Sequence, residues 1–75
     1  MISSSMKDIR SRVATALAAS SILRLRNVTV DLDENTVCLS GRVSSFYHKQ
    51  LAQEVVLAID DNVKVRNELH VESTQ

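Results

Sequence analysis

The sequence predicts an α+β fold, in which two helices pack on one face of a three-stranded mixed sheet in the order αββαβ. Two stretches, near residues 6–20 and 46–59, space apolar side chains three and four residues apart, as one face of a helix requires. Three others, residues 28–32, 37–43 and 63–71, alternate apolar and polar side chains, as half-buried strands do. The composition, 44% hydrophobic and 24% charged, is that of a folded globular domain.

The first helix is expected over residues 6–20. Ser5 is a candidate N-cap, and Asp8 is placed in the first turn, where a negative charge suits the helix dipole. The side that faces the core is predicted to carry Ile9, Val13, Ala16, Leu17 and Ser20.

The next two strands are expected to form a hairpin. The turn Asp33-Glu34-Asn35 separates them, and Asn35 is expected to take the positive φ that such a turn needs. Gly41, the only glycine, occupies an inward position, where a missing side chain lets a helix lie close to the sheet. The other inward positions are Val28, Val30, Leu32, Val37, Leu39 and Val43.

Ser44 and Ser45 are candidate caps of the second helix, and Asn62 can end it in the left-handed conformation. A strand–helix–strand crossover is almost always right-handed and makes its two strands parallel, so the sheet is predicted to be mixed, with one open face. The apolar face of the helix is predicted to be Tyr47, Leu51, Ala52, Val55, Ala58 and Ile59, and the inward face of the last strand to be Val65, Asn67, Leu69 and Val71.

A single domain is expected to span residues 1–75, with its core at about 8–71, because the chain shows no proline and no internal repeat. A domain this short buries only about 60% of its unfolded surface, so a homo-oligomer would stabilise it. The start lacks a secretory apolar region, and no apolar run approaches the ~20 residues of a membrane span. As given, the chain is expected to be cytoplasmic, and the single Cys38 fits a reducing compartment.

The formal net charge is zero, so the whole-molecule field does not attract polyanions. Aromatic residues make up only 3% of the chain, and the paired glycines with which some RNA-binding folds clamp their ligand are missing, so nucleic acid is not an expected partner. Charge is nevertheless segregated. Residues 1–27 hold a single acidic residue, Asp8, against the basic side chains of Lys7, Arg10, Arg12, Arg24 and Arg26.

Asp31-x-Asp33-x-Asn35 copies the first three ligand positions of a calcium loop, but the later glycine and glutamate positions hold other residues. A solvated hairpin turn is therefore the preferred interpretation. Cys38, His48 and His70 are too widely spaced for a ligand cluster on one element, so no metal, cofactor or catalytic residue is predicted.

An aromatic and basic cluster is predicted near the start of the second helix. Phe46 points away from the expected apolar arc, and two interpretations remain open: a hydrophobic staple, which we favour, or a contact exposed for a partner. The cluster consists of Arg42, Phe46, Tyr47 and Lys49.

Two stretches of the predicted strands carry a resemblance to a known family: Val37-Cys38-Leu39-Ser40-Gly41-Arg42-Val43-Ser44-Ser45 and Val65-Arg66-Asn67-Glu68-Leu69-His70-Val71. They look like the two signature stretches of the BON domain family and arrive in the expected order, which gives the chain its resemblance to that family. It covers roughly residues 8–71. Two glycine-bearing turns of the family are replaced here, around Asn35 and around Asp61-Asn62.

The resemblance implies a bacterial, non-catalytic protein-interaction module of the kind found in osmotic-stress and other envelope proteins, which are commonly periplasmic and membrane-associated. Phospholipid binding is the role that it suggests. We therefore expect contact with an anionic phospholipid surface or an envelope protein, through the basic first third of the chain. The alternative is a self-association or scaffold module that uses the open sheet face or the first helix.

Overall fold

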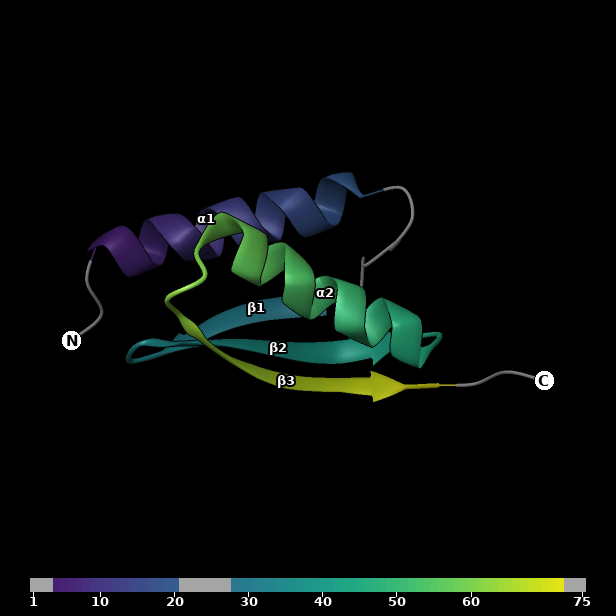
Figure 1. Ribbon diagram of the computed structural model, residues 1–75. Helices are drawn as coiled ribbons and strands as arrows, with labels where there is room; N and C mark the ends of the chain where they lie inside the picture. The colour runs from purple at the N-terminus through teal and green to yellow at the C-terminus, as the bar shows by residue number, and fades with distance from the viewer. Residues whose placement is uncertain (1–3, 21–27, 73–75) are drawn as a thin grey trace.

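The structure is a computed structural model that describes residues 4–20 and 28–72. Two helices lie side by side on one face of a three-stranded sheet and leave the other face open (Figure 1). The α+β class and the αββαβ order are therefore confirmed. The elements are α1 (Ser4–Ala19), β1 (Val28–Asp33), β2 (Thr36–Val43), α2 (Phe46–Ile59) and β3 (Lys64–Val71).

The sheet has the order β1-β2-β3, with β2 in the centre. β1 and β2 are antiparallel, as the hairpin requires, and β2 and β3 are parallel, as the crossover through α2 predicts. Val37 is opposite Leu32 on one side and Val65 on the other, so apolar side chains line up across the covered face. The sheet is mixed, as predicted.

The core lies between the helices and the covered face of the sheet. Both strand pairs and both helices contribute to it, because their apolar positions repeat with the period of each element. The fully buried side chains of largest volume are Leu39, Val13, Val37 and Val56.

Helix α1 begins earlier than predicted. Met6 is buried, which extends the apolar spacing of Ile9, Val13 and Leu17 by one turn toward the N-terminus. Ser5 therefore lies inside the helix rather than at its cap, and Asp8 lies beyond the first turn.

Helix α2 is rotated relative to the predicted face. Ala52 and Val56 are its buried residues, whereas Tyr47 and Ala58 are exposed. The prediction failed because the run from Val55 to Ile59 is apolar at every position, so spacing alone does not fix which side faces the sheet. The cap was predicted correctly in part: Ser45 is the N-cap, and its Oγ accepts the His48 N–H at 3.1 Å.

Both asparagine turns differ from the prediction. In the two-residue hairpin connection the positive φ, 56°, is at Glu34 and not at Asn35, while the Asn35 carbonyl accepts the Lys64 N–H at 3.4 Å and so ties the hairpin to β3. After α2, Asn62 does not have a positive φ. Its N–H instead donates to Asp60 Oδ1 at 2.9 Å, so a carboxylate turn ends the helix in place of a left-handed cap.

Asn67 is a polar residue on the covered face of β3, and it fastens α2 to the sheet. Its Nδ2 donates to the carbonyl of Lys49 at 2.9 Å and to Gln53 Oε1 at 3.1 Å. Its Oδ1 accepts the N–H of Leu69 at 3.3 Å. The amide thus fixes the middle of α2 above the middle of β3.

Candidate binding surfaces

The basic residues of α1 do not form one cluster. Lys7, Arg10 and Arg12 are all exposed, but successive residues turn by about 100°, which directs Arg12 about 160° away from Arg10. Arg12 also forms an ion pair with Asp8, with Nη1 and Oδ2 3.9 Å apart. Lys7 and Arg10, about 60° apart, share one flank.

Two further cations of the predicted surface, Arg24 and Arg26, lie outside the described residues. The structure therefore shows only those basic residues of the first third of the chain that lie on α1. There, one flank of α1 carries Lys7 and Arg10, followed along the helix by the exposed small residues Ala14 and Ala18. Small side chains next to cations let a helix approach a flat surface closely.

The second predicted cluster is also divided. Phe46 is 76% exposed and Tyr47 65% exposed, and they turn about 100° apart at the start of α2. The exposure of Phe46 contradicts the favoured staple interpretation and supports the other, an exposed apolar contact. Phe46 is the first residue after the cap Ser45, whereas a staple residue precedes the cap.

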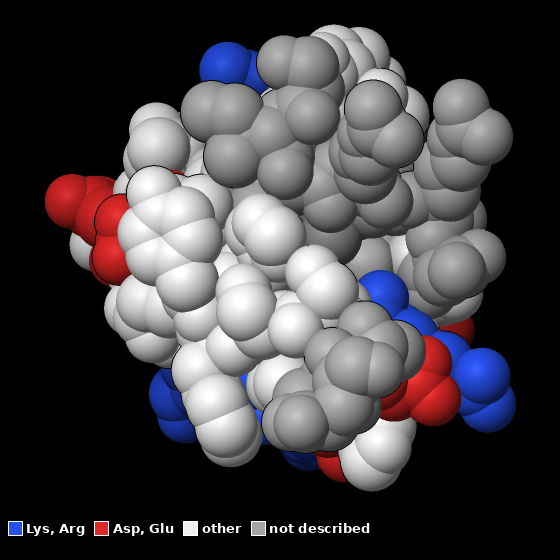
Figure 2. Space-filling view, turned by 90° about the vertical axis from the view of Figure 1, so that its right-hand side faces the viewer, with Lys and Arg blue, Asp and Glu red and all other residues white. Residues whose placement is uncertain are grey.

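Of the two basic members of this cluster, one is in an ion pair and the other is only partly exposed. Arg42 Nη1 lies 3.6 Å from Glu72 Oε2, and Lys49 is half-buried. Figure 2 faces the end of the molecule where α2 begins, and uncharged atoms form most of its described surface, with charged side chains toward the margin. The start of α2 therefore presents two exposed aromatic side chains, Phe46 and Tyr47, more than basic ones.

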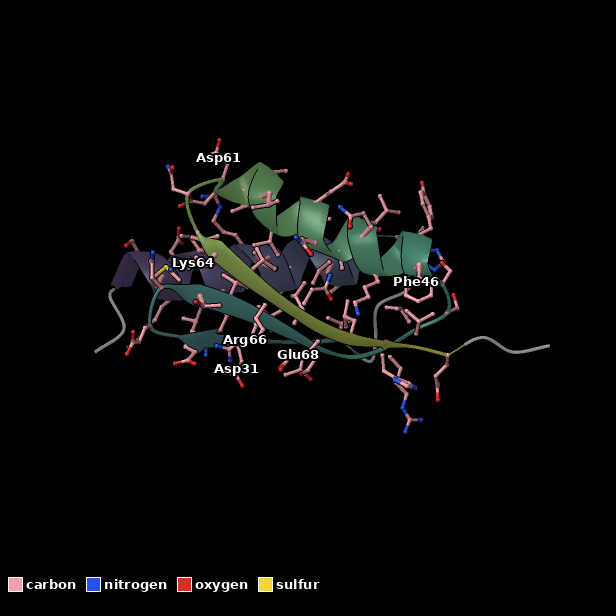
Figure 3. All side chains as sticks on the ribbon, turned by 60° about the horizontal axis from the view of Figure 1, so that its bottom comes forward. Asp31, Phe46, Asp61, Lys64, Arg66 and Glu68 are labelled. Carbon is pink, nitrogen blue, oxygen red and sulfur yellow. The ribbon has the colours of Figure 1, made fainter. Side chains whose placement is uncertain are left out.

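The open face of the sheet carries charges of both signs. Asp31, Cys38 and Arg66 are opposite one another on the three strands, and Arg66 Nη2 reaches Asp33 Oδ2 at 3.5 Å. Figure 3 shows Asp31, Arg66 and Glu68 on this face, away from the helices. Arg66 and Glu68 were not among the predicted site residues, although the alternation of charges along residues 64–70 is the signal that marks them.

No group of His, Cys, Asp and Glu among the described residues could hold a metal ion. His48 is half-buried, and its Nδ1 is 3.0 Å from Ser44 Oγ, which fits a packed, hydrogen-bonded histidine at a helix start. Within the described part of the chain, no helix is long and apolar enough to cross a membrane.

Cys38 is half-buried in the middle of the open face. We expect Cys38→Ser to change the free energy of unfolding by less than about 1 kcal/mol, because a hydroxyl is tolerated at a partly hydrated strand position. Urea titration followed by circular dichroism measures this. A loss of metal or of binding on the substitution would contradict a purely structural role.

A comparison with protein-family models finds a match for this chain. The model of the BON domain matches residues 5–73, nearly the whole chain. A search of curated proteins with this chain finds no match.

Proposed function

The chain belongs to the BON domain family, whose members are generally non-catalytic binding modules, and from this premise we propose that it binds anionic phospholipid surfaces through one flank of α1. The flank carries Lys7 and Arg10, together with Ala14 and Ala18. An envelope protein with an acidic surface is the alternative partner. Both partners would use the same cations.

The observation that carries this proposal is the division of the cations into paired and unpaired ones. Arg12 lies 3.9 Å from the carboxylate of Asp8. Arg42 lies 3.6 Å from the carboxylate of Glu72. Within the described residues, neither Lys7 nor Arg10 has a carboxylate within 4.0 Å. Their charge is therefore available to an anionic surface although the net charge of the chain is zero.

Binding of this kind is expected to be weak and sensitive to salt. Each basic residue close to an anionic bilayer is worth about 1 kcal/mol, and the attraction falls off within a Debye length of about 8 Å at physiological salt. The flank offers little apolar surface for insertion, so binding should require anionic lipid and should be lost in high salt.

We expect the double variant Lys7→Gln, Arg10→Gln to bind vesicles of mixed anionic and zwitterionic lipid roughly thirtyfold more weakly than the wild type. Vesicle sedimentation at low salt measures the change. The matched control is Arg12→Gln, Arg42→Gln, which removes the same charge from residues that face carboxylates and should bind nearly as well as the wild type.

Three outcomes would contradict the proposal. Equal weakening in both double variants would mean that only total charge matters, and unchanged binding in the first would move the contact away from α1 to the exposed Phe46 and Tyr47. If the wild type does not bind anionic vesicles at all, phospholipid is not its ligand and the envelope-protein alternative is favoured.

A further inference from the structure

Strand β3 is an edge of the sheet, and one row of its backbone groups faces outward. The N–H groups of Lys64 and Glu72 donate toward β2, to the carbonyls of Asn35 and Val43 at 3.4 and 2.8 Å. Since backbone groups alternate along a strand, the odd-numbered residues between them point their N–H and C=O groups to the free edge. Within the described residues no strand pairs with this edge, and an eight-residue edge strand is a template for another strand.

We propose that β3 pairs antiparallel with β3 of a second copy of this chain, with Asn67 on the two-fold axis. This register places Asn67 opposite Asn67 and Val65 opposite Leu69. All of these are odd-numbered residues whose backbone groups point outward, so the hydrogen-bonding groups of the two copies meet. The two sheets join into one of six strands, and the contact closes as a symmetric dimer.

Charge complementarity favours this register over its immediate neighbours. On the open face, Arg66 of each copy is placed opposite Glu68 of the other, so that symmetry forms two ion pairs. Figure 3 shows both side chains on this face of the sheet. A two-fold axis at Arg66 or at Glu68 would place like charges directly opposite each other, which destabilises a strand pair.

The other edge strand does not offer such a match. β1 has six residues and carries the carboxylates of Asp31 and Asp33, with no cation among Val28–Asp33. Pairing β1 with itself would bring these acidic side chains together across the contact. Self-association of this protein is therefore assigned to β3 and not to β1.

The position of α2 supports the axis independently. Lys49 and Gln53, which accept hydrogen bonds from Asn67, lie on the flank of α2 that leans over β3. Phe46 and Leu57 lie on this flank too, because Gln53 follows Phe46 by seven residues and precedes Leu57 by four, steps that change direction by only about 20° and 40°. Phe46 and Leu57 are about 16 Å apart along the helix axis. Both are exposed apolar side chains: Phe46 is 76% exposed and Leu57 is 37% exposed.

An axis through Asn67 also passes close to the midpoint between Phe46 and Leu57, since that midpoint lies between Lys49 and Gln53. The antiparallel arrangement then places Phe46 of each copy beside Leu57 of the other. A register centred on Leu69 also opposes unlike charges, Arg66 to Glu72, but it moves the axis away from the middle of α2 and separates this apolar pair. The helix and the strand thus specify one axis.

Two existing contacts would be replaced at little cost. The Arg66–Asp33 ion pair is exposed on both sides, at 52% and 59%, and such pairs contribute little to stability. The Leu69 N–H, now held by Asn67 Oδ1 at 3.3 Å, would donate to Val65 of the second copy instead.

Sedimentation equilibrium without lipid tests the dimer. We expect the wild type to show a reversible monomer–dimer equilibrium. Arg66→Glu and Glu68→Arg should each weaken dimerisation by roughly tenfold or more, because symmetry introduces the like-charge contact twice. The double variant Arg66→Glu, Glu68→Arg should restore it, since exchanged charges match again in this register.

A second pair of variants tests the helix contact. Phe46→Ser should weaken dimerisation. Tyr47→Ser, a matched loss of an aromatic ring that is 65% exposed and turned about 100° round α2 from Phe46, should weaken it much less. Circular dichroism melts of every variant confirm that the monomer is folded.

A monomeric wild type at millimolar concentration would overturn the proposal. So would assembly beyond two copies, which indicates an open-ended contact, or a double charge variant that stays as weak as the single ones. None of these measurements contains lipid, so the dimer and the phospholipid proposal succeed or fail separately.

Discussion

Gly41→Val is expected to lower the free energy of unfolding by about 3 kcal/mol or more, because two penalties combine at one residue. Gly41 has a φ of 121°, a backbone conformation that residues with a Cβ avoid. It also lies in the central strand, between Val28 and Leu69 of the neighbouring strands, where a branched side chain would overpack the covered face. Urea denaturation followed by circular dichroism measures the loss.

Gly41→Ala serves as the control that separates these penalties. Alanine carries the backbone penalty almost alone, so it should cost about 1–2 kcal/mol, and the difference from valine reports the packing. An unchanged midpoint for both variants would mean that residue 41 adopts an ordinary strand conformation. Sequence reasoning placed Gly41 on the inward face but supplied only the steric reason, because φ does not show in a residue pattern.

The order and type of the elements were predictable because each carries a clear period. The alternation from Val28 to Leu32 and from Val37 to Val43 fixed the faces of the hairpin, and the crossover rule fixed the parallel pairing of β2 and β3. The strand order was left open by the sequence.

Where periodicity was ambiguous, the prediction was wrong. The apolar run at the end of α2 hid Val56 and led to Tyr47 being placed on the apolar face. The prediction of the turn at Asn35 was wrong for another reason. Asparagine tolerates a positive φ, but the Asn35 carbonyl accepts a hydrogen bond from the Lys64 N–H and so contacts β3. Glu34 has the positive φ instead.

The candidate surfaces were predicted only as lists of residue types. Composition identified Lys7, Arg10 and Arg12 as basic, but only the helix phase and the pairing with Asp8 separate Arg12 from the other two. The exposure of Phe46 was one of two open alternatives in the sequence. Its relation to Leu57 and to the edge of β3 depends on the tertiary contact through Asn67.

Asn67→Asp should cost about 3 kcal/mol at pH 7, the second large effect that we expect. The Asn67 Nδ2 donates to two oxygen atoms, the Lys49 carbonyl at 2.9 Å and Gln53 Oε1 at 3.1 Å. A carboxylate there would replace both donors with an oxygen that carries negative charge, in a half-buried position between α2 and β3. Urea denaturation at low protein concentration, where any dimer is dissociated, measures the loss in the monomer.

The sign of the pH dependence distinguishes this mechanism from simple loss of packing. The two oxygens disfavour a carboxylate and raise the pKa of the new carboxyl above its ordinary value of about 4, and the protonated form can donate to the Lys49 carbonyl. The difference in stability from the wild type should therefore shrink as the pH falls through this raised pKa toward about 4. Asn35→Asp, the same charge change at an exposed turn residue, should cost less than about 1 kcal/mol at pH 7. If the cost at residue 67 is equally small, or does not decrease in acid, Asn67 does not hold α2 to the sheet through its amide, and the axis inferred from that contact loses its support.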